Sequence, residues 1–243
     1  MKVGILQFFS WSRRIPLEEV YSRAFDRVAI MDDGGYDAVW LAEHHFNTYS
    51  VCPSVCLMGT HIAARTKNLR IGTAITLGAF YHPLRLAEEL AMLDIFSGGR
   101  LNWGAGRGFD PKEFKAFRVD PAESSDRFRE CVDVILEAWQ NDTFSFHGKY
   151  WDFDEVEVLP KPKQQPLPPY WLASTSPDAV IRSAKDGHSI LMDPHSENGE
   201  IARKLKLYRD TLAENGHSFE GRTIPIARLI AIGKTEAEAE AVA

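Results

Sequence analysis

Three adjacent ionisable residues, Glu43, His44 and His45, follow directly on a short apolar run at residues 38–42. An apolar run of that length is typical of a buried strand, and ionisable groups at its end place chemistry at the strand's carboxyl end. Parallel α/β barrels carry their active sites at that end of the strands. Because an imidazole titrates near neutral pH, it can accept and return a proton during a reaction. The alternative is a hydrogen-bonded histidine that only ends a strand.

A second candidate lies at residues 104–109, where the sequence GAGRGF follows another strand-like run. The motif differs from a dinucleotide-binding turn because Phe109 occupies the third glycine position, and Asp110-Pro111 come where a helix would already be running. We therefore predict a loop here. Arg107 stands between two glycines, so its guanidinium and the nearby backbone can approach a bound anion. A surface ion pair is the alternative role for this arginine.

Three hydroxyl residues follow a later strand-like run and precede a proline: Ser174, Thr175, Ser176 and Pro177. Hydroxyls before a helix that begins with proline can cap that helix, and they can equally hold a phosphate at its N-terminus. A barrel would place the end of this strand beside the end of the Arg107 strand. The two weak signals together predict a site for a mononucleotide-type phosphate.

The composition is that of one large globular domain with a sizeable core: 243 residues, of which 44% are hydrophobic and 26% are charged. A formal net charge of -6 provides no basic patch for nucleic acid or for an anionic membrane surface, so a small-molecule ligand is expected. No apolar run reaches the length of a signal peptide or a membrane span, which predicts a cytoplasmic protein. Cys52, Cys56 and Cys131 lack metal-binding spacing and are expected to be reduced packing residues.

Strand-like and helix-like segments alternate along the chain. Strands are expected at residues 3–9, 38–44, 70–77, 101–106, 169–174, 188–193 and 224–233. Helices are expected at about 17–33, 53–65, 83–96, 124–140, 177–186 and 197–214, and a last one begins at Thr235 with a capping contact to Glu238. In 124–140 the apolar residues recur at steps of three and four, the pattern of one buried face. The connector 141–168 is expected to form a hairpin and a proline-stiffened loop.

Repeated strand–helix units with continuously apolar strands indicate a parallel sheet that is covered on both faces, either an open doubly wound sheet or a closed barrel. Candidate site residues end several strands and no glycine-rich turn follows the first strand, which favours the barrel. We predict an α/β fold, a (β/α)8 TIM-type barrel apparently truncated after the seventh strand, with residues 1–243 as a single domain. Because no eighth strand follows, we expect a fragment, a seam covered by a partner chain, or an unusual closure.

Several segments carry a family resemblance: GYDAVWLAEHHF at 35–46, LRIGTAITL at 69–77, HPLRLAEELAMLDIFSGGRL at 82–101, GAGRG at 104–108, the stretch 146–174 and KTEAEAEA at 234–241. In this order they resemble the bacterial luciferase-like, flavin-dependent monooxygenases over essentially the whole chain. EHHF after the second strand and LDxxSxGR before the fourth are specific in combination. The resemblance implies a barrel domain that binds reduced FMN, activates dioxygen, and oxygenates a small organic substrate through a flavin hydroperoxide.

The resemblance also implies roles for individual residues. His44 matches the family's catalytic histidine, with Glu43 and His45 as supporting neighbours. Arg107 matches a phosphate-binding arginine, and Arg127 matches a second phosphate contact of some members. The cofactor-binding set that the resemblance implies is completed by Ala74, Gly106, Ser174, Thr175 and Ser176. No metal is implied.

Three positions are notable in a comparison with the family pattern: one matches it and two depart from it. Several members have a strained peptide and a bulge beneath the flavin ring where this chain has Ala74-Ile75, which makes that bond a candidate for the cis form. The luciferase subunit has a reactive cysteine at the position of Gly106, so light emission is not implied here. Asp178 stands where a short hydroxyl residue is usual, and its carboxylate would repel a phosphate unless it points away.

No dinucleotide motif is present, so a separate flavin reductase is expected to supply the reduced FMN, and a homodimer is expected. Three other functions remain open: a non-catalytic flavin-binding subunit, a deazaflavin-dependent dehydrogenase on the same barrel, and a metal-dependent hydrolase using Glu43, His44 and His45. The hydrolase is disfavoured, because consecutive histidines on a strand point to opposite faces and cannot easily bind one ion.

Overall fold

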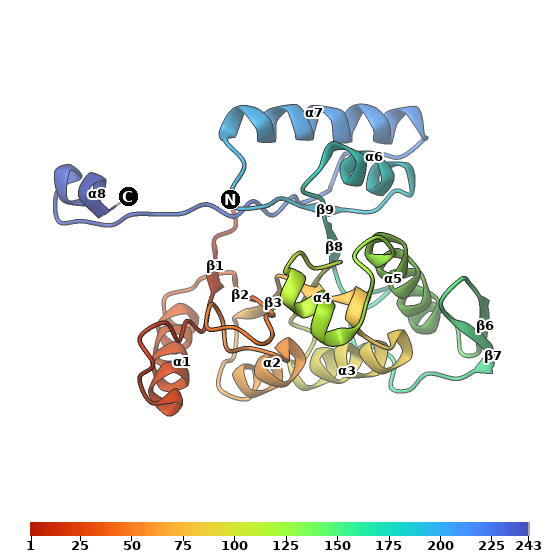
Figure 1. The fold of residues 1–243 in the computed structure, drawn as a ribbon, viewed down its shortest axis with the longest axis horizontal. Helices are drawn as coiled ribbons and strands as arrows, with labels where there is room; N and C mark the ends of the chain where they lie inside the picture. Colours follow the sequence, from red (N-terminus) through yellow and green to blue (C-terminus); the bar gives the residue numbers. More distant parts are fainter. Residues whose placement is uncertain (243) are drawn as a thin grey trace. The chain divides into compact units, whose positions relative to one another are not determined.

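The computed structural model describes residues 1–242. The chain forms two compact units, of which the first is Met1–Trp171 and the second begins at Leu172. In each unit strands and helices alternate along the chain, as the apolar periodicity predicts (Figure 1). That both units belong to one barrel domain stays a prediction.

The first unit is built on a parallel sheet. Its strands are, in spatial order, β1 (Gly4–Gln7), β2 (Ala38–Leu41), β3 (Arg70–Thr73) and β5 (Leu101–Gly106). Beyond β5, the amide of Trp103 donates a 2.8 Å hydrogen bond to the carbonyl of Pro169, directly before β8 (Tyr170–Ala173). Because all these strands run in parallel, the loops that follow them leave from the same edge of the sheet.

Helices cover this sheet. They are α1 (Leu17–Asp33), α2 (Val55–Ala63), α3 (Pro83–Phe96) and α5 (Ser124–Gln140), and α3 packs against both α2 and α5 (Figure 1). The apolar stripe predicted for 124–140 is buried, which confirms that periodicity. The largest fully buried side chains of the unit are Trp103, Phe9, Leu41, Ile62, Leu69, Ile71, Leu86, Leu90, Leu93, Leu101 and Ile135.

The strand predicted at 70–77 is interrupted by a bulge. β3 pairs with β5 through Gly72 opposite Asn102, and β4 (Thr76–Leu77) pairs with β5 through Thr76 opposite Ala105. The chain therefore advances four residues, from 72 to 76, while β5 advances three, from 102 to 105. One extra residue on the β3–β4 side is what defines a bulge. A short 3-10 turn, η1 (Gly78–Phe80), follows β4.

The LDxxSxGR segment forms part of the scaffold. The Arg100 guanidinium donates hydrogen bonds of 2.8 to 3.1 Å to oxygens of the loop between α2 and β3: Thr66 Oγ1, Thr66 O, Leu69 O and Ala63 O. The buried Asp94 carboxylate accepts bonds from the backbone and side-chain nitrogens of Gln164, at 2.8 and 2.7 Å. The motif thus joins the end of α3 to two loops that carry no site residue.

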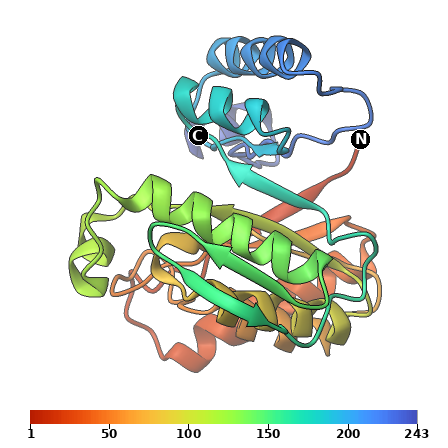
Figure 2. The same cartoon turned by 90° about the vertical axis from the view of Figure 1, so that its right-hand side faces the viewer.

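The predicted hairpin in the connector is confirmed. β6 (Phe144–His147) and β7 (Asp152–Val156) pair in antiparallel fashion, and the hairpin lies beside α5 (Figure 2). Glu130 of α5 anchors the turn, because its carboxylate accepts hydrogen bonds from the amides of Lys149, Tyr150 and Trp151. The aromatic residues of the turn are therefore held against the first half of α5.

The second unit is smaller. Leu172 and Ala173 of β8 pair in parallel with β9 (Ile190–Leu191), and helices α6 (Pro177–Lys185) and α7 (Asn198–Glu214) pack side by side (Figure 2). Its core consists of Val180, Ala184, Ile190, Met192, Tyr208 and Leu212. The predicted final helix is confirmed as α8 (Glu236–Val242), and Thr235 Oγ1 accepts the predicted capping bond from the Glu238 amide at 3.2 Å.

One sequence prediction is wrong. The strand expected at 224–233 is reduced to a single bridge between Ile226 and Met192, and Leu229, Ile230 and Ile232 are 80–89% exposed. An apolar run becomes a strand only where a neighbouring strand pairs with its backbone, and residues 227–233 have no such partner among residues 1–242.

The loop predicted after β5 is confirmed at residues 107–110. A helix that was not predicted, α4 (Pro111–Phe117), follows it.

Among residues 1–242, no helix is long and apolar enough to cross a bilayer.

Candidate active site

The three ionisable residues after β2 point alternately to its two sides. Glu43 and His45 share one side, where Glu43 Oε1 lies 3.0 Å from His45 Nε2. His44 lies on the other side, and its amide donates a 3.2 Å hydrogen bond to the Cys52 carbonyl. All three are at the carboxyl end of β2, as predicted. The alternation expected from strand geometry thus separates the two imidazoles.

A fourth ionisable residue, Glu113, joins this group from α4. Its side chain is 1% exposed, and its Oε1 atom accepts a 2.8 Å hydrogen bond from the His45 amide. The same oxygen lies 3.5 Å from His44 Nδ1, which is within ion-pair range, although that nitrogen makes no hydrogen bond within the described part of the chain. Sequence reasoning missed Glu113. The available signal was Asp110, whose side chain caps α4 through a 2.8 Å bond from the Lys112 amide.

Burial dominates the electrostatics behind the histidines. It raises the pKa of the Glu43 carboxyl, although hydrogen bonds from His45, from Tyr81 and from the Leu77 backbone oppose that rise. Burial, with the Glu43 charge as the next cause, raises the pKa of Cys52 to about 12 and raises the pKa of Cys56 well above its usual value. Both thiols therefore stay protonated and unreactive near neutral pH. They are free and buried, as predicted for packing cysteines.

Aromatic rings surround His44. The Phe8 ring stacks on the imidazole at a centroid distance of 6.4 Å, and Tyr49 and Phe109 meet it edge-on at 5.0 and 5.9 Å. The imidazole is buried, whereas Phe109 is 74% exposed. An apolar wall on several sides restricts water around the imidazole and leaves Phe109 at the outer rim.

The predicted cis peptide bond between Ala74 and Ile75 is present, and the predicted bulge coincides with it. The Ala74 amide donates a 2.8 Å hydrogen bond to the carbonyl of Leu41, the last residue of β2. Both residues of the bond are half-buried. The bulge therefore lies at the same edge of the sheet as His44, one strand away.

Two arginines lie near the first turn of α5. Arg107 follows β5 and donates a 3.1 Å hydrogen bond to Ser124 Oγ. Arg127 lies three residues after Ser124 and hence on the same helix face. Its guanidinium lies 4.8 Å from the Tyr150 ring centroid, and its buried Nε atom has no hydrogen-bond partner in residues 1–242. Two cations and an unpartnered buried donor fit an anionic group such as a phosphate.

Phe109 connects the surroundings of His44 with the loop that carries Arg107. It stands two residues after Arg107 in the loop from β5 to α4 and contacts the His44 ring. Gly106 ends β5 and is paired with Leu77 of β4, next to the bulge. Of the sequence-predicted residues, the first unit therefore contains His44, Ala74, Gly106, Arg107 and Arg127, all after strand ends or on the helix that follows.

The hydroxyl residues Ser174, Thr175 and Ser176 belong to the second unit. Ser176 caps α6, because its Oγ accepts a 3.3 Å hydrogen bond from the Ala179 amide. The Ser174 hydroxyl is buried and contacts Leu172 O and Ser183 Oγ, both at 3.2 Å. Thr175 is exposed, as is Asp178 in the first turn of α6. Of the two roles considered for these hydroxyls, Ser176 has the helix-capping one within this unit. A phosphate-binding role for residues 174–176 stays a prediction.

The described residues contain no group of three or more histidine, cysteine, aspartate or glutamate side chains that could hold a metal ion. The parallel strand–helix repeat, the histidine after β2 and the paired arginines after β5 define a β/α protein that can hold an anionic ligand at the carboxyl ends of its strands. The chain belongs to the luciferase-like monooxygenase family, whose sequence profile matches residues 1–243.

Curated relatives support this assignment. The oxygenase component of the flavin-dependent trigonelline monooxygenase of Acinetobacter baylyi is 30% identical over 228 residues, which make up 93% of this chain and 63% of that protein. The alkanal monooxygenase alpha chain of Aliivibrio fischeri is 30% identical over 185 residues, 76% of this chain and 52% of that one. The chain spans about half to two thirds of the length of the curated relatives it matches.

Solved structures share the fold. The monooxygenase RslO1 from Streptomyces bottropensis matches all of this chain and 75% of its own, with a TM-score of 0.92 and 30% identity. The oxygenating constituent of 3,6-diketocamphane monooxygenase of Pseudomonas putida, in complex with FMN, has a TM-score of 0.86 at 20% identity (98% and 69% covered). An F420-dependent secondary alcohol dehydrogenase has a TM-score of 0.78 at 19% identity (93% and 68% covered). The last two similarities bear on the fold alone.

Proposed function

We propose that this chain is a flavin-dependent monooxygenase that uses reduced FMN and dioxygen to oxygenate a small organic substrate. The observation that carries the proposal is a histidine in an aromatic enclosure, one of whose rings, Phe109, lies in the same loop as Arg107. Membership of the luciferase-like family and the flavin-dependent relative support it. The barrel form of the fold, a (β/α)8 TIM-type barrel truncated after the seventh strand, is part of the same proposal.

The residues divide into two groups in this proposal. Arg107 and Arg127 would hold the FMN phosphate, since charged hydrogen bonds from guanidinium groups suit phosphate oxygens. The remaining cofactor contacts would come from Ala74, Gly106, Ser174, Thr175 and Ser176. When bound, reduced FMN supplies the electrons that activate dioxygen, and the protein orients it and excludes water.

His44 is assigned the proton transfer. Glu113 Oε1 lies 3.5 Å from His44 Nδ1 and would favour a proton on that nitrogen, which leaves Nε2 to accept one. The aromatic enclosure keeps bulk water from exchanging that proton. Glu43 and His45 lie on the other side of the strand, where their 3.0 Å contact keeps the Glu43 charge from being buried alone.

A separate reductase is the proposed source of reduced FMN, because no dinucleotide motif is present. In GAGRGF at 104–109 Phe109 occupies the third glycine position, and the helix that follows, α4, has only seven residues. The trigonelline relative is the oxygenase component of its monooxygenase, which supports a division between an oxygenase and a separate reductase. A homodimer is proposed on the family resemblance. If the chain alone oxidised NADH rapidly in the presence of free FMN, the proposal of a separate reductase would be wrong.

A deazaflavin-dependent dehydrogenase is the second candidate, because an F420-dependent secondary alcohol dehydrogenase has the same fold and the fold by itself does not distinguish the two cofactors. A non-catalytic flavin-binding subunit is a further alternative. Binding of reduced FMN with no effect on its reaction with oxygen would favour the subunit. Binding of F420 in preference to FMN would favour the dehydrogenase.

The test is to mix the purified chain anaerobically with photoreduced FMN, admit oxygen and follow the near-ultraviolet absorbance. We expect reoxidation to be slower than that of free reduced FMN, because the site would shield the oxygenated cofactor; the proposed route through a flavin hydroperoxide depends on this result. When the protein is present in limiting amount, Arg107→Ala should abolish the difference in reoxidation rate between FMN with the chain and free FMN. The circular dichroism spectrum of this variant should match that of the wild type. Immediate reoxidation by a folded chain with FMN bound would contradict the oxygenase proposal.

A further inference from the structure

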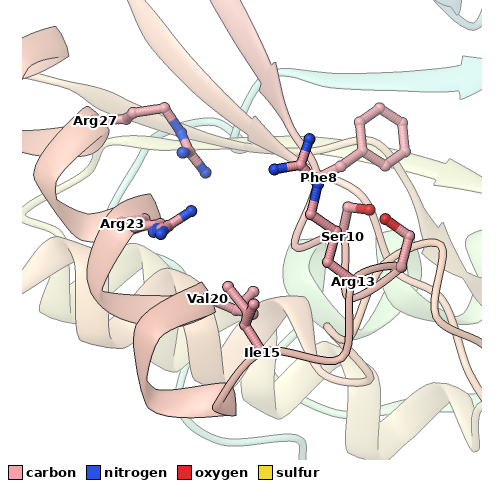
Figure 3. Close-up of a pocket in the computed structure, with 8 residues that line it drawn as sticks. Phe8, Ser10, Arg13, Ile15, Val20, Arg23 and Arg27 are labelled. Carbon is pink, nitrogen blue, oxygen red and sulfur yellow. The ribbon is translucent and has the colours of Figure 1, made fainter.

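A hollow of about 260 Å³ lies on the first unit, between α1 and the loop that follows β1. Three arginines, two serines and one aromatic ring supply its polar and flat surfaces: Arg13, Arg23, Arg27, Ser10, Ser12 and Phe8. Figure 3 shows the guanidinium groups of Arg23 and Arg27 reaching from α1 toward Arg13. We call this hollow the arginine pocket. Its volume approaches the lower end of small-molecule sites, about 300 Å³.

The charges in the arginine pocket are only partly neutralised. Arg23 forms an ion pair with Glu19, one turn before it on α1. Arg27 donates a 3.1 Å hydrogen bond to the uncharged amide oxygen of Gln7. Neither Arg13 nor Arg27 has a carboxylate within ion-pair distance in the part of the chain that the structure describes. Two exposed positive charges without a carboxylate partner thus line one small hollow, and an anion placed there would be attracted to both.

The loop that carries Arg13 is held in place by its neighbours. The Trp11 amide donates a 2.9 Å hydrogen bond to the Thr48 carbonyl, and the Trp11 indole nitrogen donates a 2.6 Å bond to Ile15 O. The Phe9 amide donates to Ser50 Oγ at 3.2 Å. The backbone of the loop is therefore tied at both ends, so binding would have to order only the exposed side chain of Arg13 and not the loop that carries it.

The arginine pocket adjoins the candidate active site through one residue. Phe8 lines the pocket, and its ring also stacks on His44 at 6.4 Å and meets Tyr49 at 4.9 Å. Phe8 thus borders both the arginine pocket and the enclosure of His44, so a ligand held by Arg13 and Arg27 against Phe8 would be one side chain away from the imidazole. Phe8 offers a flat apolar surface that suits a planar organic group.

We propose that the arginine pocket binds the carboxylate of the organic substrate, so that the enzyme acts on small organic acids in preference to neutral molecules. The planar fork of an arginine matches the two oxygens of a carboxylate, and Arg13 and Arg27 are free to make such contacts. The inference rests on the proposed function in one respect, namely that the molecule bound here is the one oxidised beside His44. Binding of the acid itself does not depend on any cofactor.

The test is a binding titration of the cofactor-free chain, followed by ligand-observed NMR, with benzoate as the probe and neutral benzamide as its isostere. We expect benzoate to bind at least about tenfold more tightly than benzamide, since a charged hydrogen bond is lost in the amide. Arg13→Gln and Arg27→Gln should each weaken benzoate binding about tenfold or more and leave benzamide unchanged. Arg13→Lys, which keeps the charge without the planar fork, should fall between them and the wild type.

Arg85→Gln is the matched control, because Arg85 is an exposed arginine of α3 that pairs with Glu89 at 2.7 Å and does not line the pocket. It removes the same charge and should bind benzoate as the wild type does. Equal affinity for benzoate and benzamide, an Arg13→Gln variant that binds benzoate normally, or an Arg85→Gln variant that is equally impaired would overturn the inference. So would displacement of benzoate by an equal concentration of inorganic phosphate, because that result describes a general anion site.

Titration of reduced FMN with the same variants separates this inference from the proposed function. Arg13→Gln should bind reduced FMN as the wild type does, since its role is in the substrate pocket. If benzoate binding follows the expected pattern while FMN is never retained, the pocket assignment stands and the flavin function is wrong. If FMN is retained and its reoxidation slowed while benzoate fails to bind, the function stands and the pocket assignment is wrong.

Discussion

Replacement of Gly104 by alanine tests the close approach between the β3–β4 segment and β5. A Cβ atom on Gly104 would lie 2.1 Å from the backbone oxygen of Thr73 and 3.3 Å from its carbonyl carbon. The backbones cannot simply separate, because the Thr73 hydroxyl links them: it donates to Gly104 O at 2.7 Å and accepts from Gly104 N at 2.9 Å. The substitution must therefore move backbone by about 1 Å or more to reach ordinary contact.

The cost follows from these contacts. Overpacking that shifts backbone costs roughly 1–3 kcal/mol. Loss of the two Thr73–Gly104 hydrogen bonds adds about 1 kcal/mol each. We expect Gly104→Ala to lower the free energy of unfolding by about 3–5 kcal/mol, whereas an unstrained Gly→Ala change raises it by about 0.4–1 kcal/mol. A loss of this size is a large part of the stability of an ordinary domain, about 5–15 kcal/mol.

Denaturant unfolding followed by tryptophan fluorescence is the assay. All six tryptophans of the chain lie within Met1–Trp171, so the signal reports on the unit that contains Gly104. Gly59→Ala is the matched control in the same unit. The three atoms nearest to its new Cβ would all be side-chain atoms, Leu93 Cδ2 at 3.0 Å, Ile71 Cγ2 at 3.1 Å and Leu93 Cδ1 at 3.3 Å, so side chains and not backbone have to shift by a few tenths of an ångström. We expect Gly59→Ala to change stability by less than about 1 kcal/mol, because the gain in helix propensity offsets the closer contact.

A Gly104→Ala variant as stable as the wild type would refute the reasoning, since the strands would then have to separate without cost. Equal losses in Gly104→Ala and Gly59→Ala would also contradict it, because the effect would come from any added methyl group. Retained stability in the control with a large loss at Gly104 is the expected pair of results.

Three further predictions concern the site and its scaffold. Arg107→Ala should weaken FMN binding about tenfold, which is the low end for a charged hydrogen bond because this side chain is exposed. His44→Ala should leave the affinity for FMN unchanged and reduce turnover. An equal loss of FMN affinity in both variants would contradict this division of roles. Burial raises the pKa of the Glu43 carboxyl, so the stability that this carboxyl contributes is complete below its ordinary pKa and is lost as pH rises through its raised pKa. Glu43→Gln should therefore flatten the fall in the free energy of unfolding between acidic and neutral pH. An unchanged pH profile would argue against a buried carboxyl that titrates in this way. Arg100→Ala should lower the free energy of unfolding by about 3 kcal/mol or more, since its hydrogen bonds to the loop before β3 are lost, and a loss under about 1 kcal/mol by the same fluorescence assay would contradict that scaffold role.

Local patterns in the sequence were sufficient for most of the helices. The bounds expected for 17–33, 83–96 and 124–140 are those of α1, α3 and α5, because a charged face, an apolar stripe and a terminal proline are all read from neighbouring residues. The hairpin after α5 and the cap at Thr235 were predicted on the same grounds. The expected strand at 224–233 shows the limit, because its residues have the right character but lack a partner in residues 227–233.

The sequence by itself determined the alternation of strands and helices and the position of His44 after a buried strand. It also determined that Arg107 follows a later strand and that Arg127 lies on a helix further on, since each depends on residue type and local spacing. Only the tertiary structure revealed that Glu113 lies beside both histidines, 68 residues further along than His45. The same holds for the arginine pocket, where Arg13 in a loop faces Arg23 and Arg27 on a helix. Contacts of this kind depend on how separate elements pack, and no periodicity within a single segment encodes that distance.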